Sequence, residues 1–166
     1  MRGKQAPKRD IDNDLKYGDK GIAKFINYIM KDGKRSVAQT IVYDAFDIIR
    51  QETKHDPRHI FNKALKRVSP LLEVRGKRVG GANYQVPFQV RGERRFYLGC
   101  HWIIDAAKAR KGRSMAEKLA AEILDASNGE FKPTKSKPKI TLKSNTFLIF
   151  FPIIFMLNKK IEVATT

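Results

Sequence analysis

The chain has 166 residues, which suits one domain with extensions, so it needs no disulfide or metal to bury a core. Its 34 Lys and Arg exceed its 17 Asp and Glu, and the net charge of +17 favours a polyanionic partner. Nucleic acid is the expected partner and an anionic membrane surface is the alternative. The single cysteine, Cys100, excludes an intramolecular disulfide or a multi-cysteine metal cluster, and it is predicted to be buried.

Residues 1–18 are predicted to form a basic N-terminal arm. Their first half is polar, lacks the apolar run of a secretory signal and carries its cations at Arg2, Lys4, Lys8 and Arg9. A basic arm of this kind is commonly a solvated tail in isolation, and it commonly becomes ordered on nucleic acid when the rest of the protein binds it.

A helical domain is predicted over residues 19–130, and three amphipathic helices open it. The first covers residues 19–31 and ends at Asp32-Gly33. The second is predicted to have Ser36 as its N-cap and to run to about residue 52, with the apolar stripe Val37, Ile41, Ala45, Ile48 and Ile49. The third begins at Asp56-Pro57, stops before Pro70, and has the stripe Ile60, Phe61, Ala64, Leu65 and Val68.

A β-hairpin is predicted at about residues 71–91, where the apolar period changes to two. The alternating apolar residues are Leu72, Val74, Tyr84, Val86, Phe88 and Val90. Gly80-Gly81 lies between the two runs and supplies the positive φ that a hairpin turn needs. Pro87 does not suit a central strand, so we expect a protruding ribbon.

Two further helices are predicted, over residues 92–111 and from the N-cap Ser114 to Asn128-Gly129. The fold class is therefore mainly α: a domain of five to six helices with one protruding two-stranded β-hairpin arm. Residues 131–166 form an atypical tail whose apolar run, residues 147–157, spans only about 17 Å as a helix against about 30 Å of bilayer hydrocarbon. We expect no stable membrane insertion.

No catalytic constellation is visible. The three histidines, His55, His59 and His101, lack the companions of a metal site, and Gly80-Gly81 lacks the Gly-Lys-Ser/Thr ending of a phosphate loop. We expect neither an enzyme nor a cofactor.

Cations instead gather at turns and at the hairpin, where Arg and Lys bind phosphates. Composition does not separate RNA from DNA, and a helix-turn-helix DNA binder stays an alternative, although the first two helices are occupied with core packing.

Three segments carry a family resemblance. Residues 24–46 (KFINYIMKDGKRSVAQTIVYDAF), 71–95 (LLEVRGKRVGGANYQVPFQVRGERR) and 102–126 (WIIDAAKARKGRSMAEKLAAEILDA) resemble the bacterial-type small ribosomal subunit protein seven family. The resemblance implies binding to the 3′ major domain of 16S-type ribosomal RNA (rRNA) and nucleation of head assembly. It also implies a hairpin near exit-site tRNA and mRNA, small-subunit proteins nine and eleven as neighbours, and a place in the ribosome of the bacterial cytoplasm or of an organelle. Some members bind their own messenger, so a translational repressor is the alternative.

The resemblance also implies which residues bind RNA. They are Lys8, Arg9, Lys34, Arg35, Arg75, Lys77, Arg78, Gly80, Gly81, Arg91, Arg94, Arg95, Lys108, Arg110, Lys111 and Arg113. Two features depart from the family pattern. His101 stands where the family usually has Arg, and residues 132–166 do not resemble its final basic helix, for which a frameshifted or divergent C-terminus is our hypothesis.

Overall fold

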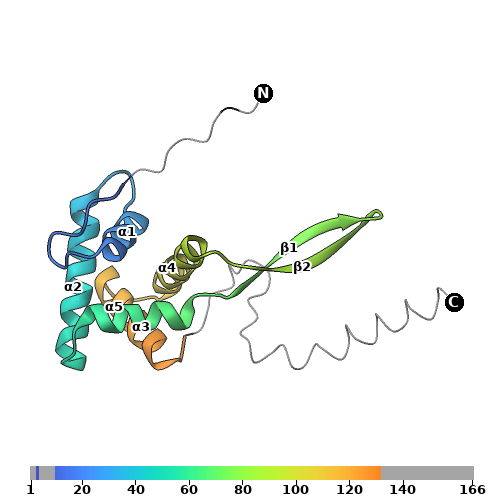
Figure 1. The fold of residues 1–166 in the computed structure, drawn as a ribbon. Helices are drawn as coiled ribbons and strands as arrows, with labels where there is room; N and C mark the ends of the chain where they lie inside the picture. The colour runs from blue at the N-terminus through green and yellow to red at the C-terminus, as the bar shows by residue number, and fades with distance from the viewer. Residues whose placement is uncertain (1–2, 4–9, 132–166) are drawn as a thin grey trace.

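In the part of the chain that the structure describes, five helices pack together and a two-stranded ribbon projects from them (Figure 1). The structure is a computed structural model that describes residue 3 and residues 10–131. It confirms the predicted mainly α fold with a protruding hairpin arm. Lys8, Arg9 and the apolar run at residues 147–157 lie outside the described residues. Within them, no helix is long and apolar enough to cross a bilayer.

The first two helices are α1 (Lys20–Ile29) and α2 (Arg35–Thr53). The carboxylate of Asp19 caps α1 by accepting from the N–H of Gly21 at 2.7 Å. The prediction of Ser36 as the N-cap of α2 is wrong. Asp32 and Gly33 both adopt left-handed φ, 53° and 74°, which completes the turn early and puts the cap at Lys34 without a side-chain bond.

The apolar stripe of α2 also differs from the prediction. Val37 is 54% exposed, because the face that α2 turns to the core is shifted by one residue. The buried positions are Ala38, Val42, Ala45, Phe46 and Ile49, whereas Ile41 and Ile48 only border them. Phe46 takes the central place, with its ring 5.7 Å from that of Phe61.

Helix α3 (Pro57–Val68) forms as the sequence predicts. Asp56 accepts from the N–H of Arg58 at 3.0 Å, and Pro57 occupies the first turn, where its missing donor costs nothing. All five predicted apolar residues of this helix are buried. Its Phe61 ring lies 4.8 Å from Phe25 of α1, so the centre of the core is aromatic.

The ribbon consists of β1 (Leu72–Val79) and β2 (Ala82–Gln89), paired antiparallel. Gly80 and Gly81 have φ of 55° and 85°, so they form a two-residue turn with positive φ at both positions. As elements, the strands pack on each other and on none of the helices. The predicted hairpin and its glycine turn are confirmed.

Helices α4 (Gly92–Ala109) and α5 (Met115–Asn128) complete the body. Ser114 caps α5, as predicted, by accepting from the N–H of Glu117 at 3.4 Å. Helix α5 packs against α2, α3 and α4, which makes it the central helix. Cys100 of α4 is fully buried in this core, as its apolar setting predicts.

Replacing Phe46 with alanine tests the corrected stripe. The Phe46 side chain is fully buried, so Phe46→Ala is expected to lower the free energy of unfolding by about 3–5 kcal/mol. Val37→Ala, on the exposed face of the same helix, is the matched control and is expected to change it by about 0.5 kcal/mol or less. Urea denaturation measures both, and equal losses would contradict the assigned face.

The thiol of Cys100 is expected to be unreactive in the folded protein. Burial raises its pKa to about 12, and the thiolate is the form that reacts. A thiol reagent at pH 8 should therefore label the native protein far more slowly than the urea-unfolded protein, in which the pKa returns to its usual value. Comparable rates in the two states would contradict this burial.

Candidate nucleic-acid interface

One face of the ribbon combines cations with exposed aromatic rings. The antiparallel register sets Arg75 opposite Val86 and Lys77 opposite Tyr84, so their side chains share a face. Tyr84 is 57% exposed and Phe88 is 44% exposed. The guanidinium carbon of Arg75 lies 5.9 Å from the centre of the Phe88 ring. Cations bind phosphates and ring faces stack on bases, so this face has both kinds of group that single-stranded nucleic acid needs.

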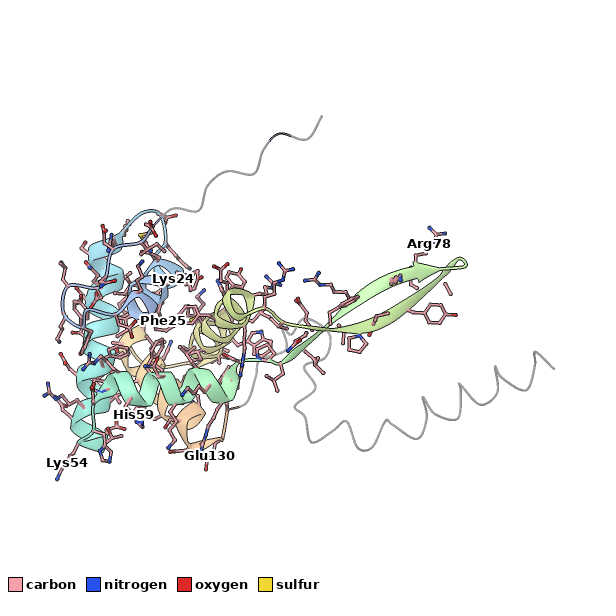
Figure 2. All side chains as sticks on the ribbon, viewed as in Figure 1. Lys24, Phe25, Lys54, His59, Arg78 and Glu130 are labelled. Carbon is pink, nitrogen blue, oxygen red and sulfur yellow. The ribbon has the colours of Figure 1, made fainter. Side chains whose placement is uncertain are left out.

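The tip of the ribbon lies far from the helices. Figure 2 shows Arg78 beside the turn, at the opposite end of the molecule from Lys54. Arg78 pairs in register with Asn83, on the face of the ribbon opposite to Lys77. The predicted residues Lys77, Arg78, Gly80 and Gly81 therefore gather at the tip, with cations on both faces.

At the foot of the ribbon, one carboxylate connects β1 to α4. Glu73 accepts from Arg94 at 3.1 Å and lies 3.7 Å from Arg75, and its own side chain is only 16% exposed. The structure thus brings together two predicted RNA-binding arginines that are 19 residues apart. Ion pairs with exposed arginines contribute only about 0–1 kcal/mol, so the effect of Glu73 is mainly to orient both guanidinium groups.

Two other predicted residues lie close to Arg94 at the start of α4. Arg91 is the N-cap of α4 and is exposed. Arg95 is partly buried, and its Nε has no hydrogen-bond partner within the described part of the chain. Together, Arg91, Arg94 and Arg95 place three cations between the end of β2 and the first turns of α4, at the foot of the ribbon.

The α1–α2 turn holds a separate pair of predicted residues. Lys34 and Arg35 are exposed, and neither side chain forms an ion pair with another described residue. The left-handed residues Asp32 and Gly33 shape this turn. Lys34 and Arg35 are therefore free to bind an external anion.

The α4–α5 turn contains the last group, and Arg110 behaves differently from its neighbours. Its guanidinium donates to Glu122 at 2.6 Å and also to Asp125, so it joins α4 to α5. Lys111 and Arg113 are exposed and unpaired within residues 10–131, while Lys108 lies 3.9 Å from Asp105. Arg110 thus has internal partners, and Lys111 and Arg113 are the accessible cations of this turn.

Two clusters were not predicted from the sequence. A cavity of about 460 Å³ lies between the end of α2 and the start of α3, and its lining residues are Lys16, Tyr17, Arg50, Lys54, His55, Asp56, Pro57 and Arg58. The second cluster consists of Tyr28, Tyr97 and His101, with Arg94 beside it. The sequence contained a signal for the second cluster, because Tyr97 and His101 are four residues apart and so share a helix face. No cluster of three potential metal ligands occurs in the described part of the chain.

The pairing of Arg110 predicts a stability effect. Arg110→Met leaves the carboxylate of Glu122, which is 5% exposed, without its cation. We expect a loss of about 2 kcal/mol, less than the roughly 3–5 kcal/mol for a fully buried pair, because the guanidinium is itself 37% exposed. Arg113→Met, in the same turn, should change stability by about 0.5 kcal/mol or less. Thermal and urea unfolding measure both, and adding Glu122→Gln to Arg110→Met should recover part of the loss.

Comparison with known proteins places the chain in a family. A family model described as ribosomal protein S7p/S5e matches residues 1–142. Proteins named small ribosomal subunit protein uS7 are among its relatives. The one from Carboxydothermus hydrogenoformans is 56% identical over 131 residues, covering 79% of this chain and 84% of the relative. The one from Thermotoga maritima is 53% identical over 137 residues, covering 82% and 88%. The chain therefore belongs to the ribosomal protein S7p/S5e family, whose members are structural, non-enzymatic proteins of the ribosome, as the resemblance predicted.

Proposed function

We propose that this protein binds the 3′ major domain of 16S-type rRNA, nucleates assembly of the small-subunit head, and extends its hairpin toward exit-site tRNA and mRNA. The observation that carries the proposal is the ribbon face on which Arg75 and Lys77 lie beside the exposed rings of Tyr84 and Phe88. Small-subunit proteins nine and eleven are the proposed neighbours, on family likeness alone.

The proposed mechanism is neutralisation of phosphates combined with recognition of RNA shape. With a net charge of +17, the positively charged side chains repel one another in a compact fold. Each RNA phosphate that they bind reduces that repulsion and releases counterions from the RNA. A-form grooves present phosphates and hydroxyls more readily than base edges, so cations placed at separate turns fit folded RNA. Accessible cations at the hairpin tip, its foot and the two interhelical turns would contact several RNA segments at once.

The side-chain geometry supports distinct roles for the predicted residues. Lys77 and Arg78 at the tip are proposed to contact RNA remote from the helices. Arg75 and Arg94, oriented by Glu73, are proposed to bind rRNA phosphates at the foot. The remaining proposed contacts, on the N-terminal arm, at the foot and at the interhelical turns, are Lys8, Arg9, Lys34, Arg35, Gly80, Gly81, Arg91, Arg95, Lys108, Lys111 and Arg113. Arg110 is proposed to position the last of these turns through its internal ion pairs.

Salt titration of binding to an rRNA head-domain fragment tests the proposal. Neutralising about six phosphates predicts a slope of log affinity on log salt of roughly −4 to −5. The double variant Lys77→Gln/Arg78→Gln should reduce the magnitude of that slope by roughly 1.5, since two phosphate contacts are lost.

The charge-matched control is Lys63→Gln/Lys66→Gln, which removes two exposed lysines of α3 that are absent from the proposed interface. It should leave the slope near that of the unmodified protein. A slope near zero for the unmodified protein would overturn RNA binding by phosphate neutralisation. Equal reductions in both double variants would instead overturn the specific role of the arm.

A further inference from the structure

An aromatic cluster lies on α4 next to the foot of the ribbon. The rings of Tyr97 and His101 are 4.2 Å apart, and the ring of Tyr28, from α1, lies 5.6 Å from Tyr97 and 5.1 Å from His101. The guanidinium carbon of Arg94 is 5.2 Å from the centre of the Tyr97 ring. Three rings and one cation, contributed by two helices, thus form a continuous group.

This cluster is partly accessible to solvent. Tyr97 is 37% exposed, and Tyr28 and His101 are partly exposed. Tyr28 and Phe96 border the hydrophobic core, whereas Tyr97 is one of the few large hydrophobic side chains with such exposure among the described residues. Tyr97 therefore leaves more of its surface in solvent than a core aromatic residue does.

The imidazole of His101 behaves as a neutral aromatic ring. Burial holds the pKa of His101 below its usual value; the charge of Asp105 opposes this effect, and the weaker effects of Lys108 and Arg94 add to it. The neutral form of the ring is therefore favoured near pH 7, so His101 contributes mainly a ring face to this surface.

We infer that Tyr97, in contact with the rings of His101 and Tyr28, is a stacking platform for one unpaired base of the bound RNA. This inference rests on the proposed function and extends it from phosphate contacts to a base contact. Every base has a π face, and stacking on an exposed aromatic ring requires no particular base sequence.

The surrounding charges favour a nucleotide over an apolar protein segment. The guanidinium of Arg94 lies over the Tyr97 ring and pairs with Glu73, so a cation is at hand for the phosphate of the nucleotide whose base stacks. Arg91, on the preceding turn, adds a second exposed cation. An apolar partner would desolvate these cations without supplying an anion, which is costly.

Two substitutions at Tyr97 separate stacking from charge. Tyr97→Leu removes the ring and keeps an apolar side chain, and it should weaken binding of the full chain to the rRNA head-domain fragment roughly 5- to 150-fold. Its slope of log affinity on log salt should match that of the unmodified protein, because no phosphate contact is lost. Tyr97→Phe retains the ring and should bind within about twofold of the unmodified protein. Circular dichroism and thermal melting check that both variants fold.

Nuclear magnetic resonance of the unmodified protein is a second test of the stacking platform. Aromatic ¹H–¹³C resonances of Tyr97 and His101 are followed on adding an eight-nucleotide single strand of adenosine and uridine, and separately on adding inorganic polyphosphate of equal charge. Stacking should move the Tyr97 ring protons upfield with RNA and leave them nearly unchanged with polyphosphate.

These experiments distinguish failure of the stacking platform from failure of the proposed RNA binding. Salt-dependent binding that is unaffected by Tyr97→Leu, or equal shifts with RNA and polyphosphate, would overturn the stacking platform and leave phosphate binding intact. Absence of any salt-dependent binding by the unmodified protein would overturn the proposed function itself.

Discussion

The packing of α5 against α2, α3 and α4 is the constraint on which the helical body depends. Two polar attachments fix that helix: Arg110 of the preceding turn pairs with Glu122 and Asp125, and Arg67 of α3 donates to the carbonyl of Ser127. The buried carboxylate of Glu122 needs a cation, and Arg110, which the sequence resemblance presents as an RNA ligand, pairs with it and so joins α4 to α5. The turn that follows Arg110 then presents its other cations from a fixed base.

The ribbon depends on the helices only at its foot. A two-stranded hairpin is marginally stable alone. This one leads directly into α4 at its foot, where the Glu73–Arg94 pair orients the two elements and contributes little stability of its own. Along its length the side chains are free of core packing, and the exposed rings of Tyr84 and Phe88 reflect that freedom. Selection for a stable core therefore constrains the helices, whereas the ribbon can devote both faces to a partner.

Local chemistry made several elements predictable. The Asp56-Pro57 cap, the Gly80-Gly81 turn and the stripe of α3 follow from backbone preferences within a few residues. The predictions of Ser36 as an N-cap and Val37 as a core residue were wrong because Asp32 adopts a left-handed conformation, which is uncommon for residues other than glycine, and this shifted the start of α2. The cations of the candidate interface were recognisable in the sequence by their residue type. Their internal partners were not, because Glu73–Arg94 and Tyr28–Tyr97 join residues that only the tertiary fold brings together.

The length of the ribbon determines how strongly the charges at its two ends interact. Each strand has eight residues, and at about 3.3 Å per residue the arm extends about 26 Å from its foot. The Debye length at physiological ionic strength is about 8 Å, so mobile ions screen the charges at the two ends of the arm from each other. The tip therefore attracts anions almost independently of the body. A partner long enough to meet both ends is held at two separate points, and releasing one leaves the other in place for rapid rebinding.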